Sequence, residues 1–302
     1  MKKIWLFILL SVLFTAGCNK SDENTEIVPA TETHQPQPEK NLLEPAVAYE
    51  PQPDSWINPE GTTLRERFLL PEHYERVETG EGSFEQYLQM LPMKADGTKV
   101  HYYDGTEKAK DVYLGVVDFS LGSRDLQQCA DSVMRLRAEY LYSRQRYDEI
   151  SFHFVSGFRA DFSKWRQGYG ISVKGNEVTW ISKPANNDSY ESFQSYLDIV
   201  YAYASTLSLE KELISKSTDQ LGIGDVFIVG GSPGHCVIVV DMAVNKQNGE
   251  TLFMLAQGYM PAQDIQILRG DQSESPWYSL DQKDTLVTPE WQFQLDQLRG
   301  WP

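Results

Sequence analysis

The sequence predicts an α+β fold in which helices pack on an antiparallel sheet. Apolar residues at helical spacing occupy the middle of the chain, whereas β-branched runs separated by turn residues gather toward the C-terminus. The dipeptide Asn248-Gly249 between two such runs is a strong hairpin signal, and a hairpin makes its two strands antiparallel.

The first seventeen residues predict a secretory signal peptide. Lys2 and Lys3 precede an apolar run over residues 4–14, which is too short to span a hydrocarbon core that needs about 20 residues. Small residues follow, and Cys18 comes directly after them. This pattern resembles the lipobox of bacterial lipoproteins, although Thr15 stands where Leu is more usual. The resemblance implies cleavage before Cys18 and lipid on its thiol; the alternative is an ordinary signal peptide with an incidental cysteine.

Residues 18–55 predict a lipidated cysteine followed by a disordered tether. The segment is rich in Pro and acidic residues and poor in large apolar ones, so it cannot bury enough surface to offset its ordering entropy. Its first charged run, residues 20–23, resembles the acidic surface-export signals of Bacteroidetes-type lipoproteins. Simple solvation of a linker is the alternative.

The charge of the chain excludes two classes of partner. The formal net charge is −16, and acidic residues outnumber basic ones both in the tether and in the remainder. Nucleic-acid binders need a basic face, and electrostatic docking to anionic lipid needs one too. We therefore expect a membrane contact through the lipid anchor, and no nucleic acid.

Residues 56–302 read as one globular domain, because no second linker and no internal repeat interrupts them. Helices are predicted over residues 83–91, 123–146 and 190–213. Strands are predicted over residues 111–119, 150–154, 171–173, 178–181, 226–229, 236–244 and 251–256. The second helix carries an apolar stripe that includes Cys129, and it places Cys129 more than one turn from its start.

Several sequence patterns typical of catalytic sites are either absent or stand beside the wrong secondary structure. Gly230-Gly231-Ser232-Pro233-Gly234 matches a nucleophile elbow in letters, but a strand follows where a helix is required, and no His comes after His235. The five His have no metal-ligand spacing and no phosphate-binding glycine loop is present, so neither a metal nor another cofactor is expected.

Cys129 and Cys236 leave three readings open: a disulfide, two buried thiols, or one reactive thiol. His235 and Cys236 are adjacent in a predicted strand, so their side chains should point to opposite faces. Cys129 should then meet one of them and not the other.

The segments Gly224-Asp225-Val226-Phe227-Ile228 and Gly234-His235-Cys236-Val237-Ile238 resemble the strands of the NlpC/P60 and CHAP cysteine hydrolases. The resemblance implies a permuted papain-like arrangement in which Cys129 is the nucleophile, His235 the base, and a polar residue on the next strand the orienting group. A two-residue turn at Asn248-Gly249 puts Ala262 opposite His235, and one bulged residue would bring Gln263 there. The expected orienting residue is therefore Gln263, and then Gln257.

The chain as a whole resembles a lipoprotein family known as domain of unknown function 4846, on Gln128-Cys129-Ala130-Asp131 and on residues 255–263. That resemblance implies no activity. Two functions remain: a cysteine amidase or peptidase acting on peptidoglycan or peptide, and a non-catalytic surface module that binds glycan or protein, in which Cys129 is a buried hydrophobe and His235 is structural. In both cases the expected location is the cell envelope, lipid-anchored to the outer membrane, on its periplasmic or its outer face.

Overall fold

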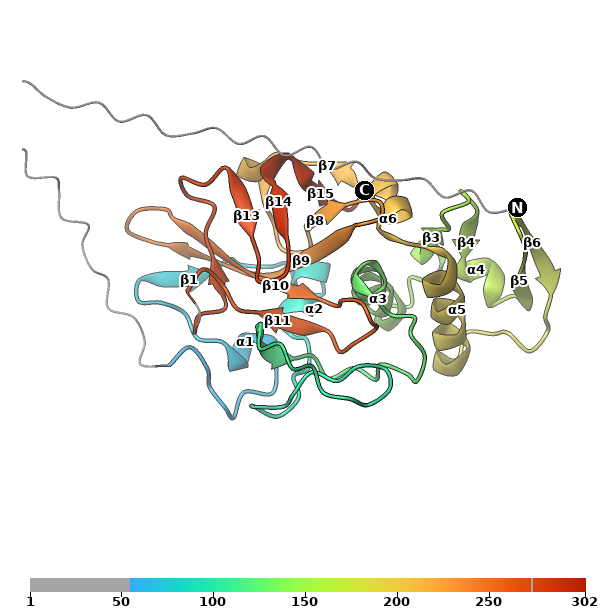
Figure 1. Ribbon diagram of the computed structural model, residues 1–302, viewed down its shortest axis with the longest axis horizontal. Coiled ribbons are helices and arrows are strands. Elements are labelled where there is room, and N and C mark those ends of the chain that lie inside the picture. Colours follow the sequence, from blue (N-terminus) through green and yellow to red (C-terminus); the bar gives the residue numbers. More distant parts are fainter. Residues whose placement is uncertain (1–54, 273) are drawn as a thin grey trace, which may run out of the picture. The chain divides into compact units, whose positions relative to one another are not determined.

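The computed structural model describes residues 55–272 and 274–302. The predicted signal peptide, Cys18 and all of the tether except Ser55 lie outside the described residues. The described chain is a mixed α+β structure, as predicted, in which a large antiparallel sheet is accompanied by a few helices (Figure 1). No helix within this part of the chain is long and apolar enough to cross a bilayer.

The main sheet has nine strands and is organised around the long hairpin β9–β10. Its path runs β2-β11-β10-β9-β8-β15-β7, while β1 pairs with the far end of β9 and β12 pairs with β10. The strands are β1 Tyr74–Arg76, β2 Tyr113–Val116, β7 Ile214–Ser215, β8 Val226–Val229, β9 His235–Asn245, β10 Thr251–Gln257, β11 Gln266–Leu268, β12 Trp277–Tyr278 and β15 Leu298–Gly300.

Strand β9 forms the centre of the core. Ten of its eleven residues are buried, which agrees with its almost continuous apolar sequence. Helices α2 (Phe84–Gln89) and α3 (Cys129–Ser143) pack against it, and the hairpin β13 (Thr285–Val287) and β14 (Gln292–Gln294) packs against β8. One polar residue in β9, Asp241, is bound by Arg76 at 2.6 Å and by Gln89 at 2.7 Å.

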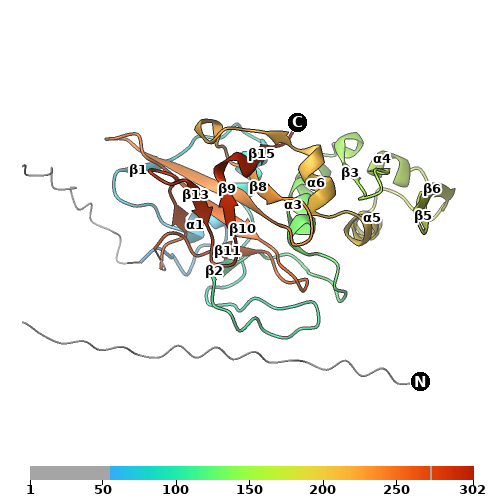
Figure 2. The ribbon, with the colours of Figure 1, turned by 45° about the horizontal axis from the view of Figure 1, so that its top comes forward.

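A smaller group of elements follows α3 in the chain. It consists of β3 Ser151–His153, β4 Arg159–Asp161, α4 Phe162–Trp165, β5 Tyr169–Lys174, β6 Glu177–Ser182 and α5 Tyr190–Tyr203. The short helices α1 (Leu64–Arg67) and α6 (Thr206–Glu212) complete the fold. In Figures 1 and 2, α3 lies between the sheet and this smaller group, so it is covered on both sides. The Asp131, Arg135 and Glu139 side chains of α3 are accordingly buried.

Two predicted helices have different bounds. The helix expected over 123–146 begins at Cys129, because Asp125 instead accepts the backbone N–H of Ala262 at 2.7 Å and so holds the preceding segment in a non-helical conformation. The helix expected over 190–213 is interrupted at Ala204 and Ser205. Ser205 is extended and caps α6 by accepting the Leu207 N–H at 3.1 Å.

The predicted hairpins are present, with one difference in register. Gly175 and Asn176 connect β5 and β6 as expected. In the β9–β10 hairpin, Asn245 bonds to Glu250 across a four-residue loop rather than a two-residue turn. A bulge then follows between Met254 and Leu255. The strand 111–119 is shorter than predicted and forms β2.

Candidate active site

Cys129 is the first residue of α3. The preceding Gln128 is extended, and its N–H is accepted by the Asp131 carboxylate at 3.0 Å, which fixes the start of the helix. The expectation that Cys129 lies more than a turn inside its helix is therefore wrong. At the first helical position, the dipole and the free N–H groups of the first turn both favour a thiolate.

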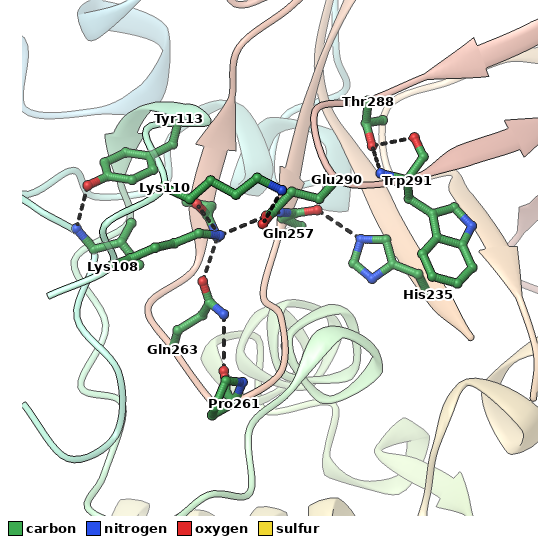
Figure 3. Close-up of polar contacts among 12 residues, drawn as sticks. Lys108, Lys110, Tyr113, His235, Gln257, Pro261, Gln263, Thr288, Glu290 and Trp291 are labelled. Carbon is green, nitrogen blue, oxygen red and sulfur yellow. Dashed lines mark hydrogen bonds and ion pairs between the residues drawn. The ribbon is translucent and has the colours of Figure 1, made fainter. Parts of the chain in front are cut away.

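His235 is the first residue of β9 and is almost fully buried. Its Nε2 lies 2.8 Å from Gln257 Oε1, at the end of β10 (Figure 3). The rings of Tyr259, Trp291 and Phe293 surround the imidazole, with centroids 4.8, 5.5 and 6.0 Å away. Aromatic packing and one polar partner thus restrict the ring.

The tautomer of His235 follows from a second contact of Gln257. Gln257 Nε2 donates to Glu290 Oε2 at 2.7 Å, and a carboxylate can only accept. The amide is therefore oriented with Oε1 toward His235, so His235 Nε2 must carry the proton. Nδ1 is then the unprotonated nitrogen, available as a base.

Glu290 is held as a carboxylate by two lysines. Lys108 Nζ is 2.7 Å from Oε2 and Lys110 Nζ is 3.4 Å from Oε1. Burial raises the pKa of Glu290, but the hydrogen bond and charge of Lys108, together with Lys110, outweigh burial and lower the pKa. Burial also lowers the pKa of Lys108, partly offset by Glu290.

Neither Glu290 nor Lys108 was expected from the sequence. They are 182 residues apart in the chain, and no local motif marks either of them. The signal that identifies them is the hydrogen-bonded path Lys108–Glu290–Gln257–His235 in Figure 3.

Gln263, the residue expected first as the orienting group, lies elsewhere. Its Nε2 donates to the Pro261 carbonyl at 3.0 Å, and its Oε1 accepts from Gln266 at 3.1 Å. The expectation that Gln263 lies opposite His235 is wrong, because the longer turn and the bulge shift the register of β10. Gln257, the second expectation, contacts the imidazole.

The Cys129 thiol interacts with both the Cys236 thiol and the His235 imidazole. Cys236 lowers the pKa of the Cys129 thiol most and His235 lowers it further, to about 5, although burial alone would raise it. The expectation that Cys129 would meet only one of the two residues is wrong. His235 and Cys236 are the first two residues of β9, and the start of α3 lies against this end of the strand. Both cysteines are free thiols.

Cys129 and His235 both line one cavity of about 400 Å³. It is lined by the first turn of α3, the loop of residues 231–234, and the side chains of Tyr259, Met260 and Trp291. Cys129 is 8% exposed at this cavity, and Met260 is 62% exposed at its rim. The described residues that line two larger cavities, of about 550 and 790 Å³, include no Cys or His, and those that line a cavity of about 410 Å³ include His101 but no Cys.

Gly258 lets the strand β10 approach the start of α3. A Cβ at this position would collide with Ser132 Oγ and lie 2.9 Å from the Gln128 carbonyl. Glycine therefore permits Gln257 and Tyr259, on either side, to lie beside Cys129 and His235.

Two further observations concern the loop of Ser232 and the arrangement of possible metal ligands. The loop containing Ser232 joins two strands and does not enter a helix, in agreement with the rejection of a serine nucleophile. Across residues 55–272 and 274–302, no cluster of three or more His, Cys, Asp or Glu has an arrangement suited to a metal ion.

Comparisons with known proteins identify the family of the chain. No curated protein matches the sequence, and no solved structure matches the fold. The model of the family described as domain of unknown function 4846 matches residues 64–300. These residues include every member of the site, and the chain belongs to this family.

Proposed function

We propose that this protein is a lipid-anchored cell-envelope protein whose domain is a cysteine amidase or peptidase. The observation that carries the proposal is the placement of Cys129, at the first position of α3, against an imidazole whose tautomer is fixed by Gln257 and Glu290. This arrangement has the nucleophile, base and orienting group of a papain-like site in the expected chain order.

The reaction begins with a thiolate–imidazolium pair. His235 Nδ1 takes the Cys129 proton, and the thiolate sulfur attacks the carbonyl carbon of an amide. The C=O electron pair moves onto oxygen, and the N–H groups at the start of α3 are suited to stabilise that charge. His235 then protonates the leaving amine as the C–N bond breaks, which leaves a thioester.

Water completes the cycle. His235 Nδ1 accepts a proton from water, which attacks the thioester carbon, and the C–S bond breaks to release the acid and the thiolate. Throughout, Gln257 Oε1 accepts the Nε2–H, so a neutral orienting group keeps the ring in position. Glu290 acts on Gln257 and does not touch the reacting atoms, so it is a positioning residue.

The cavity supports a peptide-like substrate from the cell envelope. Tyr259 and Trp291 form aromatic walls beside the thiol, and Met260 adds an exposed apolar edge. The predicted signal peptide and lipidated Cys18 would hold such an enzyme next to peptidoglycan. Peptidoglycan peptides are therefore the first substrates to test, followed by other peptides.

The alternative is a non-catalytic module that binds glycan or protein. The aromatic residues of the cavity would also suit stacking on a sugar. In that case Cys129 would behave as an ordinary buried thiol, and its reactivity would not depend on His235.

Alkylation of Cys129 by iodoacetamide separates the two functions. We expect rapid labelling at pH 6, and labelling slower by about 10-fold in His235→Ala, because the imidazole supplies part of the lowering of the thiol pKa. His101→Ala, which alters a half-exposed histidine outside the cavity, is the matched control. All variants carry Cys18→Ala, so that Cys18 does not react.

Hydrolysis is measured in parallel by mass spectrometry of peptides released from peptidoglycan. Release that is lost in Cys129→Ala supports the amidase. Slow labelling that is equal in the parent, His235→Ala and His101→Ala, without release of any peptide, would favour the binding module.

A further inference from the structure

We propose that Cys129 and Cys236 form a reversible disulfide when a hydroperoxide enters the cavity, and that this bond switches the hydrolase off. The formation of the disulfide stands on the placement of the two thiols at the starts of α3 and β9. The regulatory consequence rests on the proposed function.

The two cysteines stand at the starts of two elements that pack together, α3 and β9. Cys129 begins α3, Cys236 is the second residue of β9, and the two thiols are close enough for each to shift the pKa of the other. Both cysteines are free thiols in the structure. A bond between them would therefore join two elements that already pack together.

The two thiols differ in access. Cys236 is completely buried, whereas Cys129 is 8% exposed and lines the cavity. An oxidant that enters the cavity therefore meets Cys129 first, and Cys236 reacts only through Cys129. This is the arrangement of a reactive cysteine beside a resolving cysteine.

The acid–base properties of the pair agree with this order. The contacts with Cys236 and His235 lower the pKa of Cys129 to about 5, and burial raises the pKa of Cys236 well above its ordinary value. Cys129 is thus the thiolate that attacks the peroxide, and Cys236 stays a protonated thiol until a partner sulfur is available.

The chemistry balances in two steps. The Cys129 thiolate attacks one peroxide oxygen, so that an S–O bond forms, the O–O bond breaks and hydroxide or alkoxide leaves with a proton as water or alcohol. The sulfur of Cys236 then attacks the sulfur of Cys129. The S–O bond breaks, and the departing hydroxide takes the Cys236 proton as water. The two thiols lose two electrons, and the hydroperoxide is reduced.

The disulfide would also protect the nucleophile. A sulfenic acid without a resolving thiol can be oxidised further to sulfinic and sulfonic acids, which thiols do not reverse. With Cys236 in contact, Cys129 is instead stored in a form that a thiol reductant restores.

The experiment treats the full chain carrying Cys18→Ala with hydrogen peroxide and follows its intact mass and its iodoacetamide labelling. We expect the mass to fall by two hydrogen atoms, labelling of Cys129 to fall at least about 10-fold, and dithiothreitol to restore both. Peptide mapping should place the bond between Cys129 and Cys236.

Cys236→Ser and Cys236→Ala are the matched variants. In both, with excess peroxide, we expect a gain of two or three oxygen atoms on Cys129 and no recovery of this oxidised fraction with dithiothreitol. In Cys129→Ala, the buried Cys236 should stay unmodified. Oxygen gain in the parent without a disulfide, or the same recovery in the Cys236 variants, would overturn the proposal.

Peptide release measured on the same samples separates this proposal from the hydrolase. If the disulfide forms reversibly but the protein releases no peptide in either redox state, the disulfide is supported and its role in regulating a hydrolase is rejected. Release that persists in the disulfide form would reject the switch itself.

Discussion

A histidine that acts as a base needs a neighbour that fixes which of its two nitrogens carries the proton. For His235 that neighbour is the amide of Gln257, which could by itself adopt either of two orientations. Gln257 presents an oxygen and a nitrogen of nearly equal size, and only Glu290 decides between them. The role of Glu290 is therefore to remove one of two orientations of Gln257. Glu290 can do this only as a carboxylate, which accepts hydrogen bonds and donates none. Lys108 and Lys110 favour this ionised form.

We expect Glu290→Gln to lower kcat for amide hydrolysis by about 10-fold while KM changes little. A glutamine at position 290 can donate as well as accept, so Gln257 can turn and offer its NH2 group to His235. Lys110→Gln is the control, because it removes only the exposed partner of Glu290. Steady-state kinetics of peptide release give both constants, and an unchanged kcat in Glu290→Gln would show that the amide is oriented without Glu290.

Asp131 should make stability depend on pH. Burial, followed by the negative charge of Cys129, raises its pKa well above the ordinary value, and its Oδ1 has no hydrogen-bond partner. The folded state then binds the proton more tightly than the unfolded state, so stability falls as pH rises above about 4, the unfolded pKa, toward the folded pKa.

The Asp131→Asn variant has no titratable group at this position, so its stability does not fall with pH for this reason. Its amide oxygen can still accept the Gln128 N–H. We expect the variant to be more stable than the parent by about 1–3 kcal/mol at pH 8, and the difference to shrink toward pH 4. Denaturant unfolding at several pH values measures it. A difference that is constant over this range would mean that Asp131 is ionised in the folded protein.

At the scale of elements, the site forms where three chain segments meet: the start of α3, the start of β9 and the end of β10. Two of these ends are fixed by contacts with distant residues, since Asp125 holds Ala262 and Gly258 lies against Gln128 and Ser132. The geometry of the site therefore depends on how closely β10 and its following loop approach α3.

Gly258→Ala tests that close approach. The added methyl group must displace Ser132 or the Gln128 carbonyl, so we expect a loss of about 1–3 kcal/mol in stability and slower alkylation of Cys129. Gly80→Ala is the matched control, since its Cβ would meet only Ser83 at an ordinary 3.8 Å. Thermal unfolding and iodoacetamide labelling measure the two effects. Equal behaviour of both variants would mean that the loop adapts without cost.

The elements that the sequence predicted correctly are those whose signals are local. The apolar runs of β8, β9 and β10 and the turn at Gly175 and Asn176 belong to this class. The start of α3 was missed because Asp125 is used by Ala262, 137 residues away. The sequence could not show which of Gln257 and Gln263 lies beside His235, because the length of the turn and one bulge decide the register of β10.

At the scale of the whole molecule, the site and the predicted anchor lie in different parts of the chain. Cys18 and the tether precede the family match at residues 64–300, and the catalytic candidates fall within that match. Anchoring and catalysis should therefore be separable: a chain without the lipid keeps its chemistry and loses its location.

We expect Cys18→Ala to move the protein from the membrane fraction to the soluble fraction. Two acyl signals are enough for stable anchoring, and a chain with a net charge of −16 is not attracted to anionic lipid in their place. Fractionation of cells and metabolic labelling with a fatty acid measure the two properties, and Cys236→Ser, which removes a buried thiol of the domain, is the control. Iodoacetamide labelling of Cys129 should be the same in the released protein as in the anchored one. A parent protein that incorporates no fatty acid, or a Cys18→Ala variant that stays with the membrane, would contradict the anchor and leave the domain to be located by other means.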